Sequence, residues 1–289
     1  MKTLLQRTIK NKETNLYPVW LMRQAGRYMP EYMAIKAESN GFLDMALTPS
    51  KATEITMQPI KEFDMDAAII FSDILIINYA LGQELDYTPG PVLGPYNESF
   101  WETTEDEFIQ KCEPVYEAIR RVREELDDSK SLIGFAAAPY TLCKYMCDSI
   151  DSDVVNRLIP YIVTHLSMQI EAGCDTIQIF DSHAGDISEH DFDEIVIEPT
   201  KIIVDVIRAH YPHVCIIAFP RLVGDKINKY IEIVNPDCTN ISDDKPVDEI
   251  HGEVLQGGIS VSRLIKGEDI TPVLDNFVKQ NLYILIYKH

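Results

Sequence analysis

The sequence predicts an α/β fold, a single (β/α)8 TIM barrel, and three observations support this prediction. Eight short apolar runs rich in Val, Ile and Phe recur along the 289 residues. Runs of this length without strict alternation are typical of strands buried on both faces, as in parallel sheets. Helical patterns separate them, which implies right-handed crossovers. No linker or break in composition divides the chain, so residues 1–289 are expected to form one domain.

The individual elements follow from local patterns. The expected strands are residues 18–22, 67–71, 132–135, 176–180, 214–219, 238–241, 254–257 and 282–287. Apolar residues with helical spacing predict a helix from Phe108 to Leu126, and further helices are expected over residues 159–172 and 192–210. Thr48 followed by Pro49 is typical of a helix start, here for a helix extending through Lys61.

The net charge of the chain limits the kinds of molecule that it is expected to bind. There are 26 basic and 46 acidic residues, which give a net charge of -20. Such a surface disfavours nucleic acid and anionic membranes, and an anionic ligand would need a locally positive site. No apolar run approaches the ~18 residues of a membrane span, and the first residues lack the apolar core of a signal peptide. Together with six cysteines that form no disulfide framework, these features indicate a soluble cytoplasmic protein.

Catalytic groups of a barrel lie where its strands end. At the end of the first expected strand, Arg23 and Arg27 stand four residues apart, and Lys36 follows nine residues later. The residues between the two arginines are Gln24, Ala25 and Gly26. Arginines bind carboxylates in a bidentate manner, and small residues let the backbone approach a ligand. The alternative is that both arginines form surface ion pairs with acids such as Glu31.

Asp73 follows the second expected strand and is the strongest acidic candidate. Its carboxylate could act as a base, a metal ligand or a partner for a cationic N–H group. The alternative is a helix N-cap, which Ser and Asp favour.

Two further segments carry weaker signals. Small residues over 134–139 leave room for a bulky ligand, and Tyr145 lies about a turn beyond them. Ser182 is adjacent to His183, but no Gly-x-Ser-x-Gly elbow is present, so Ser182 is expected to hydrogen-bond a ligand instead of acting as a nucleophile. The acidic residues over 186–193 match no metal-ligand template, and no nucleotide-binding motif occurs, so no cofactor is expected.

Four segments resemble the uroporphyrinogen decarboxylase family. Residues 18–28 (PVWLMRQAGRY) resemble its first signature, and residues 134–142 resemble its second. Residues 67–75 (AAIIFSDIL) and 179–185 (IFDSHAG) also match. The resemblance extends from about Leu16 to the C-terminus. It implies a TIM barrel that forms homodimers with facing active sites and uses no metal or organic cofactor. The implied reaction, a step of haem and porphyrin biosynthesis, removes CO2 from the four acetate side chains of uroporphyrinogen III and gives coproporphyrinogen III.

The resemblance also implies residue roles. Arg23 and Arg27 would hold substrate carboxylates, with residues 24–26 as the loop around them. Asp73 would hydrogen-bond the pyrrole N–H groups, and Asp73 and Arg23 are the implied catalytic residues. The remaining implied substrate contacts are Tyr145, Ser182, His289 and Lys36, the last standing where an arginine is common in the family.

The C-terminal third departs from the family. The motifs at residues 219–224 and 256–261 differ, and the sequence stops at His289, before the helix that normally closes the barrel. Two alternatives therefore stay open. One is a catalytically weak paralog that binds porphyrinogens. The other is a corrinoid methyltransferase of the same superfamily, although those enzymes generally use a zinc site where this chain has the arginine signature.

Overall fold

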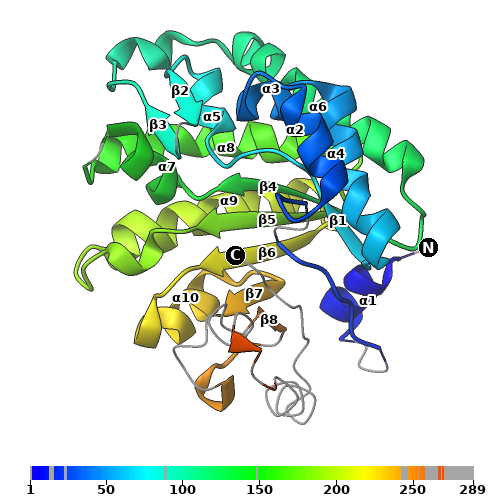
Figure 1. The fold of residues 1–289 in the computed structure, drawn as a ribbon. Helices are drawn as coiled ribbons and strands as arrows, with labels where there is room; N and C mark the ends of the chain where they lie inside the picture. The colour runs from blue at the N-terminus through cyan, green and yellow to red at the C-terminus, as the bar shows by residue number, and fades with distance from the viewer. Residues whose placement is uncertain are drawn as a thin grey trace.

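The computed structural model describes residues 2–12, 16–22, 25–87, 90–147, 149–241, 247–252, 254–257, 266–267 and 269 (Figure 1). Within them, the α-helices are α1 (Leu4–Asn11), α2 (Pro30–Ala37), α3 (Phe42–Ala46), α4 (Pro49–Phe63), α5 (Ile76–Ala80), α6 (Glu105–Glu125), α7 (Pro139–Cys147), α8 (Ser152–Glu171), α9 (Glu198–His210) and α10 (Ile227–Val234). The strands are β1 (Ala67–Ile69), β2 (Leu85–Tyr87), β3 (Pro91–Leu93), β4 (Ser131–Ala137), β5 (Thr176–Asp181), β6 (Cys215–Pro220), β7 (Cys238–Ile241) and β8 (Leu255–Gly257). Short 3-10 turns are η1 (Glu98–Glu102), η2 (Ala184–Asp186), η4 (Gly224–Lys226) and η5 (Val247–Glu249), and η3 (Asp193–Ile197) is a π-helical turn.

Six of the described strands form a curled parallel sheet in the order β1-β4-β5-β6-β7-β8, and β2 and β3 form a separate antiparallel pair. Nε2 of Gln256 in β8 donates to Oε1 of Gln178 in β5 at 3.2 Å, although the two strands are three positions apart in the sheet. A flat sheet would separate those strands by about 14 Å. Side chains can meet across that interval only when the sheet curls around its interior. The predicted α/β barrel class is thus confirmed, with six of its strands in the described residues.

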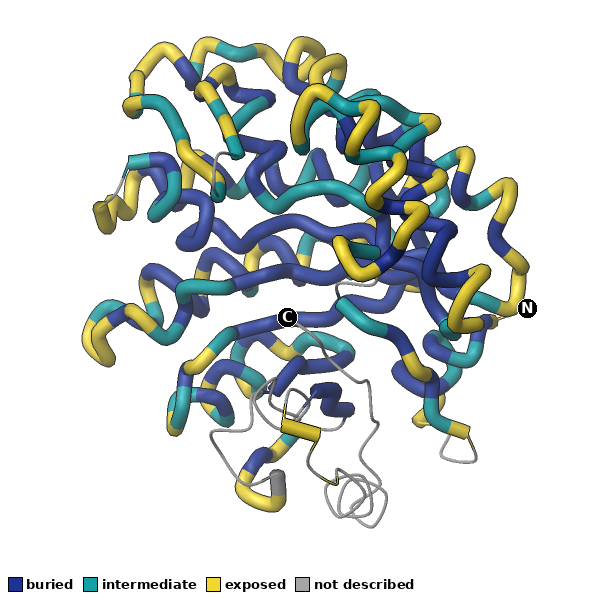
Figure 2. The backbone as a smooth tube through the Cα atoms, viewed as in Figure 1, coloured by how far each residue is buried: buried dark blue, intermediate teal, exposed yellow. Residues whose placement is uncertain are grey.

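The core lies in and around this sheet. Every residue of β4, β5 and β6 is buried, and Figure 2 shows these strands in dark blue across the middle of the view. Helix α6 buries Phe108, Val115 and Val122 along one face, which confirms the helix expected from their spacing. A capping box of Thr104 and Glu107 satisfies the first N–H groups of α6. No helix within the described ranges is long and apolar enough to cross a bilayer.

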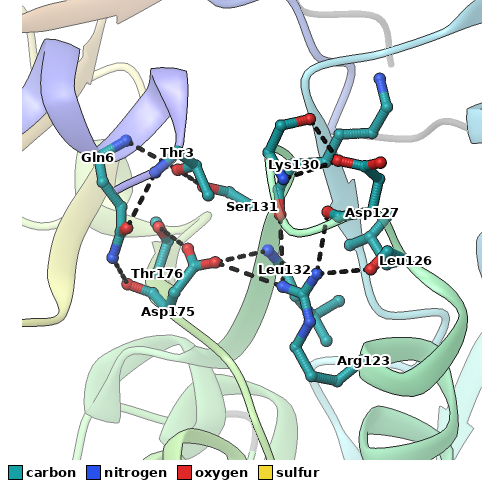
Figure 3. Close-up of polar contacts among 11 residues, drawn as sticks. Thr3, Gln6, Arg123, Leu126, Asp127, Lys130, Ser131, Leu132, Asp175 and Thr176 are labelled. Carbon is teal, nitrogen blue, oxygen red and sulfur yellow. Dashed lines mark hydrogen bonds and ion pairs between the residues drawn. The ribbon is translucent and has the colours of Figure 1, made fainter. Parts of the chain in front are cut away.

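A polar network ties the elements together where the strands begin (Figure 3). The guanidinium of Arg123 donates to the carbonyl oxygens of Leu126, Asp127 and Lys130 at 2.9, 3.1 and 3.3 Å. It also lies 3.7 Å from the carboxylate of Asp175, which accepts from the Leu132 N–H at 3.1 Å. On the other side, Thr3 hydrogen-bonds Ser131, and Gln6 donates to the Asp175 carbonyl at 3.4 Å. Helix α1 is thereby fixed at this end, which leaves the opposite end of the sheet open for a site.

The structure differs from the predicted elements at two places. Residues 18–22 are irregular instead of a strand, because Pro18 has no N–H and the Val19 N–H donates to the carboxylate of Asp66 at 2.7 Å. The antiparallel β2–β3 hairpin was not predicted. The segment expected to be helical over residues 192–210 is helical, with the π-helical turn η3 followed by α9 from Glu198. The expected strand over 282–287 and the expected absence of a closing helix lie outside the described residues.

Candidate active site

A cavity of about 820 Å³ lies at the end of the sheet where the strands finish. It is lined by residues that follow β1, by side chains of β4, β5 and β6, by α4, and by the β2–β3 hairpin. In Figure 1 the hairpin and α7 lie on the left, where the strand arrows point, and α1 lies on the right, where the strands begin. The cavity and the Arg123 network therefore occupy opposite ends of the sheet.

Phenylalanines form an apolar wall of this cavity. The rings of Phe135 in β4 and Phe180 in β5 meet edge to face with centroids 5.4 Å apart, and Phe180 meets Phe219 in β6 at 5.7 Å in the same way. Phe71, just after β1, also lines the cavity and packs against Phe42 at 5.3 Å. Such a wall suits the flat face of an aromatic or macrocyclic ligand.

Asp73 lines the cavity from the segment after β1. Its Oδ1 accepts from the Leu75 N–H at 2.8 Å, just before α5 begins at Ile76. This contact resembles the N-cap that the sequence left as the alternative, yet the carboxylate also faces the ligand space. The backbone contact thus fixes the carboxylate in the cavity.

Two tyrosines share the surroundings of Asp73. Tyr87 from β2 and Tyr145 from α7 both line the cavity. Burial, and then the negative charge of Asp73, raises the pKa of Tyr87 and also that of Tyr145. Both hydroxyls therefore stay protonated at neutral pH. They can donate hydrogen bonds but supply no charge that competes with Asp73.

The loop predicted to bind carboxylates is partly described. Ala25, Gly26 and Arg27 line the cavity, and Arg27 is exposed in the turn before α2. Arg23 and Gln24 lie outside the described residues. A guanidinium at the mouth of an apolar cavity can bind an anion with little competing bulk water inside.

Ser182 lines the cavity in a tight turn after β5. The Arg221 N–H donates to the Asp181 carbonyl at 3.0 Å, and the Gly185 N–H donates to the Arg221 carbonyl at 3.0 Å. A Cβ on Gly185 would lie 2.3 Å from the Leu222 carbonyl oxygen, so the turn requires glycine there. The turn is thus bound to the end of β6 on both sides of Ser182.

Charged groups surround Tyr145 at the rim. The ring of His183 meets the Tyr145 ring at 5.3 Å, and His183 Nδ1 lies 2.8 Å from Oδ2 of Asp186. The same carboxylate forms an ion pair with Lys144. Hydrogen bonds from Lys144 and His183 hold the pKa of Asp186 below its usual value. This acid is therefore paired with Lys144 and hydrogen-bonded to His183. Within the described part of the chain, no group of three or more His, Cys, Asp or Glu side chains is arranged to hold a metal ion.

Six of the predicted site residues surround this one cavity, and the others do not or cannot be placed. The six are Ala25, Gly26, Arg27, Asp73, Tyr145 and Ser182. Lys36 is in the last turn of α2 and is not among the described residues that line the cavity. His289, like Arg23 and Gln24, lies outside the described residues.

Sequence reasoning missed several residues of the cavity. Tyr87 comes from a hairpin of three-residue strands, which is too short to show a pattern. Ile55 and Pro59 come from the face of α4 that lines the cavity, not from a strand end. For the phenylalanines of the cavity wall, one sequence signal was available: Phe recurs in four of the expected strands.

Comparisons with known proteins agree on one family. The family model described as uroporphyrinogen decarboxylase (URO-D) matches residues 1–282. A protein of Rickettsia bellii named uroporphyrinogen decarboxylase is 40% identical over 271 residues, which covers 86% of this chain and 79% of that protein. A Rickettsia felis protein of the same name is 35% identical over 286 residues and is covered to 82% of its length, with 90% of this chain matched.

Solved structures resemble this chain in fold. A methyltransferase from Methanosarcina mazei superposes with a TM-score of 0.78 at 14% identity, covering 98% of this chain and 90% of that one. A structure from Listeria monocytogenes titled as a putative vitamin-B12 independent methionine synthase gives a TM-score of 0.53 at 13% identity, covering 94% of this chain and 89% of that one. At such identities the likeness concerns the fold alone.

Proposed function

Because the chain belongs to the uroporphyrinogen decarboxylase family, we propose that it is a carboxy-lyase that removes CO2 from the four acetate side chains of uroporphyrinogen III to give coproporphyrinogen III. One observation carries the proposal. Asp73 and Arg27 line the same cavity, and that cavity has an apolar, phenylalanine-lined wall. A macrocycle with eight peripheral carboxylates and four inward N–H groups matches these three features.

Binding relies on local cations against an unfavourable overall charge. The chain carries a net charge of -20, which repels a polyanionic substrate at long range. Arg27 at the cavity, together with Arg23, would bind carboxylates by bidentate hydrogen bonds, with Gln24, Ala25 and Gly26 as the loop around them. The low dielectric of the apolar wall strengthens each of these contacts.

Asp73 would provide the main catalytic contribution. Protonation of a pyrrole ring gives an iminium-like cation, which accepts the electron pair of the C–C bond as that bond breaks and CO2 leaves. The resulting exocyclic methylene carbon then takes up a proton and becomes the methyl group, and the ring releases the proton it first received, which restores the pyrrole. A fixed carboxylate beside the pyrrole N–H groups stabilises the positive charge as it develops, so the site needs no added electron sink.

The remaining residues would orient the macrocycle. Tyr145 keeps its proton and can donate to the substrate, and Ser182 can do the same from the turn after β5. His289 and Lys36 are proposed as further carboxylate contacts, from the family resemblance alone. Arg23 is the second proposed catalytic residue.

The reaction is tested by anaerobic incubation of the purified protein with uroporphyrinogen and chromatographic measurement of coproporphyrinogen. The Asp73→Asn variant keeps the size of the side chain and removes its charge, and we expect turnover to fall at least about 100-fold. The matched control is Asp128→Asn, which makes the same change at an exposed position. A folded wild-type protein that forms no product would refute the decarboxylase assignment. Equal rates for Asp73→Asn and Asp128→Asn would refute the role of Asp73.

Porphyrin binding separates the enzyme from its nearest alternative. A catalytically weak paralog would bind uroporphyrin with normal affinity and release no CO2 from uroporphyrinogen. Fluorescence titration of the protein with uroporphyrin, run beside the turnover assay, distinguishes the two functions. A corrinoid methyltransferase would instead show methyl transfer and no preference for the polyacid porphyrin.

We further propose a cytoplasmic homodimer of single-domain chains, residues 1–289, that binds neither nucleic acid nor membrane. Support for dimerisation comes from exposed apolar side chains near the cavity rim. Tyr28, Val92 and Leu222 are 54%, 55% and 53% exposed, and Tyr28 and Val92 follow the cavity-lining Arg27 and Pro91. Sedimentation velocity on wild type and Val92→Asp tests this: a monomeric wild type at micromolar concentration would refute it.

A further inference from the structure

Thr141 lies behind the cavity wall and does not line the cavity. It is the third residue of α7 and is fully buried. Its Oγ1 donates to Oδ1 of Asp181 at 2.8 Å and accepts from the His183 N–H at 3.2 Å. These two partners stand immediately before and after Ser182. The Thr141 hydroxyl therefore contacts the residues on both sides of Ser182, which lines the cavity.

Asp181, which accepts the hydrogen bond from Thr141, is equally buried. Asp181 is the last residue of β5 and has no exposed surface. Among the described residues, its Oδ2 has no hydrogen-bond partner, and its Oδ1 accepts from the Thr141 hydroxyl. A buried polar group with so few partners would not be retained for stability alone, since burying it without full pairing is unfavourable.

Backbone contacts hold the rest of the turn. The Asp181 carbonyl and the Gly185 N–H are both bound to Arg221, on the β6 side. Thr141 holds the turn from the α7 side, and Tyr145 lies one helical turn further along the same helix. The Thr141 hydroxyl thus couples the position of Ser182 to the helix that carries Tyr145.

We propose that Thr141 is a positioning residue that holds Ser182 in the orientation required to hydrogen-bond the substrate. The proposal rests on the function proposed above and adds a residue that touches no substrate. The Thr141 hydroxyl acts through Ser182, and the Thr141 methyl group is not needed for this.

Three single variants separate the hydroxyl from packing. Thr141→Val keeps the shape and removes the hydroxyl, and we expect kcat/KM for uroporphyrinogen to fall roughly tenfold. Thr141→Ser keeps the hydroxyl, and its activity should stay within about twofold of wild type. The control is Thr53→Val, which removes another buried threonine hydroxyl, one that donates to the Pro49 carbonyl of its own helix at 2.8 Å and to the Ala118 carbonyl of α6 at 3.4 Å. Thr53→Val should leave kcat/KM unchanged.

A double-mutant cycle with Ser182→Ala decides whether Thr141 acts through Ser182. We expect the effect of Thr141→Val on kcat/KM to shrink to less than about twofold in the Ser182→Ala background. The same roughly tenfold loss in both backgrounds would overturn the proposal, as would a Thr141→Ser variant as impaired as Thr141→Val. If Thr141→Val does not fold, Thr141→Ala replaces it in the cycle. Alanine lacks the γ-methyl group that valine places in the position of the hydroxyl, against the buried carboxyl.

The cycle can also be read without turnover. Titration with uroporphyrin, followed by porphyrin fluorescence anisotropy, gives a dissociation constant for each variant. A wild type that makes no coproporphyrinogen would remove the proposed function, while the binding cycle would still report on Thr141. Additive losses of affinity in Thr141→Val and Ser182→Ala would overturn the positioning role even in an active enzyme.

Discussion

Acidification should destabilise this protein through His165, a buried residue of α8. Its side chain is only 3% exposed, and its Nδ1 shares a hydrogen bond of 2.9 Å with the hydroxyl of Tyr116 in α6. Burial lowers the pKa of His165 from 6.5 to about 3. The folded state therefore keeps the ring neutral at a pH where the unfolded chain takes up a proton.

The sign and size of the effect follow from linkage. The pKa of His165 is lower in the folded state, so its contribution to stability is complete above pH 6.5 and is lost as the pH falls from 6.5 towards 3. Between pH 7 and pH 5 the loss in the free energy of unfolding amounts to about 2 kcal/mol. That is a substantial part of the roughly 5–15 kcal/mol by which folded domains are typically stable.

The assay compares wild type with His165→Gln by urea unfolding at pH 7 and pH 5. Glutamine stays neutral and can still hydrogen-bond Tyr116. Acidification from pH 7 to pH 5 should therefore lower the free energy of unfolding of the wild type by about 2 kcal/mol relative to that of the variant. The matched control is His190→Gln, because the side chain of His190 is 96% exposed and its removal should leave the pH dependence unchanged. A stability difference between wild type and His165→Gln that is the same at both pH values would refute the reasoning.

The comparison with a variant is necessary because Asp181 titrates in the opposite sense. Burial raises its pKa from 3.8 to about 7, so the folded state binds a proton that the unfolded chain has lost. Its contribution is most favourable below pH 3.8 and declines as the pH rises through 7. The free energy of unfolding of the wild type therefore contains two pH-dependent contributions of similar size, from His165 and from Asp181, which partly cancel.

Three further predictions concern Asp181 and the two ends of the sheet. Asp181→Asn should gain stability relative to wild type as the pH rises from 5 to 8, by roughly 2–3 kcal/mol in urea unfolding; a pH-independent difference would contradict the buried titration. Gly185→Ala places a Cβ 2.3 Å from the Leu222 carbonyl oxygen, so it should lower the melting temperature and kcat/KM together; normal values of both would show that the turn is not constrained. Arg123→Ala removes hydrogen bonds at the far end of the sheet and should lower the free energy of unfolding by about 2 kcal/mol with KM unchanged; a large change in KM would mean that the two ends are coupled.

The fold class and the strand-end residues could be predicted because both depend on local patterns. Buried parallel strands are continuous apolar runs, and residues that follow such runs meet at one end of a barrel. Asp73 and Ser182 were identified in this way, and Tyr145 from its place about one turn beyond the small residues over 134–139. The structure brings all three to one cavity. Their roles as substrate contacts stay predictions.

The errors arose where distant residues decide the local structure. Residues 18–22 have the composition of a strand, but Asp66 takes the Val19 N–H that a strand would use. Nothing within the run signals a carboxylate 47 residues away. Tyr87 was missed for a related reason, since it packs against Phe42, a residue distant in the sequence, and its short hairpin strand shows no alternation of its own.

Residues that hold a site are harder to find in a sequence than residues that touch a ligand, and two threonines show why. Thr56 Oγ1 in α4 donates to the Ala52 carbonyl at 2.7 Å and accepts from the Phe71 N–H at 2.9 Å, two residues before Asp73. Thr141 makes the equivalent contact beside Ser182. In both cases a helix hydroxyl accepts from an N–H group that lies two residues beyond the end of a strand. The chain can therefore change direction abruptly at these points and still present a fixed side chain to the cavity, and a threonine in a buried helix face is the sequence feature that permits it.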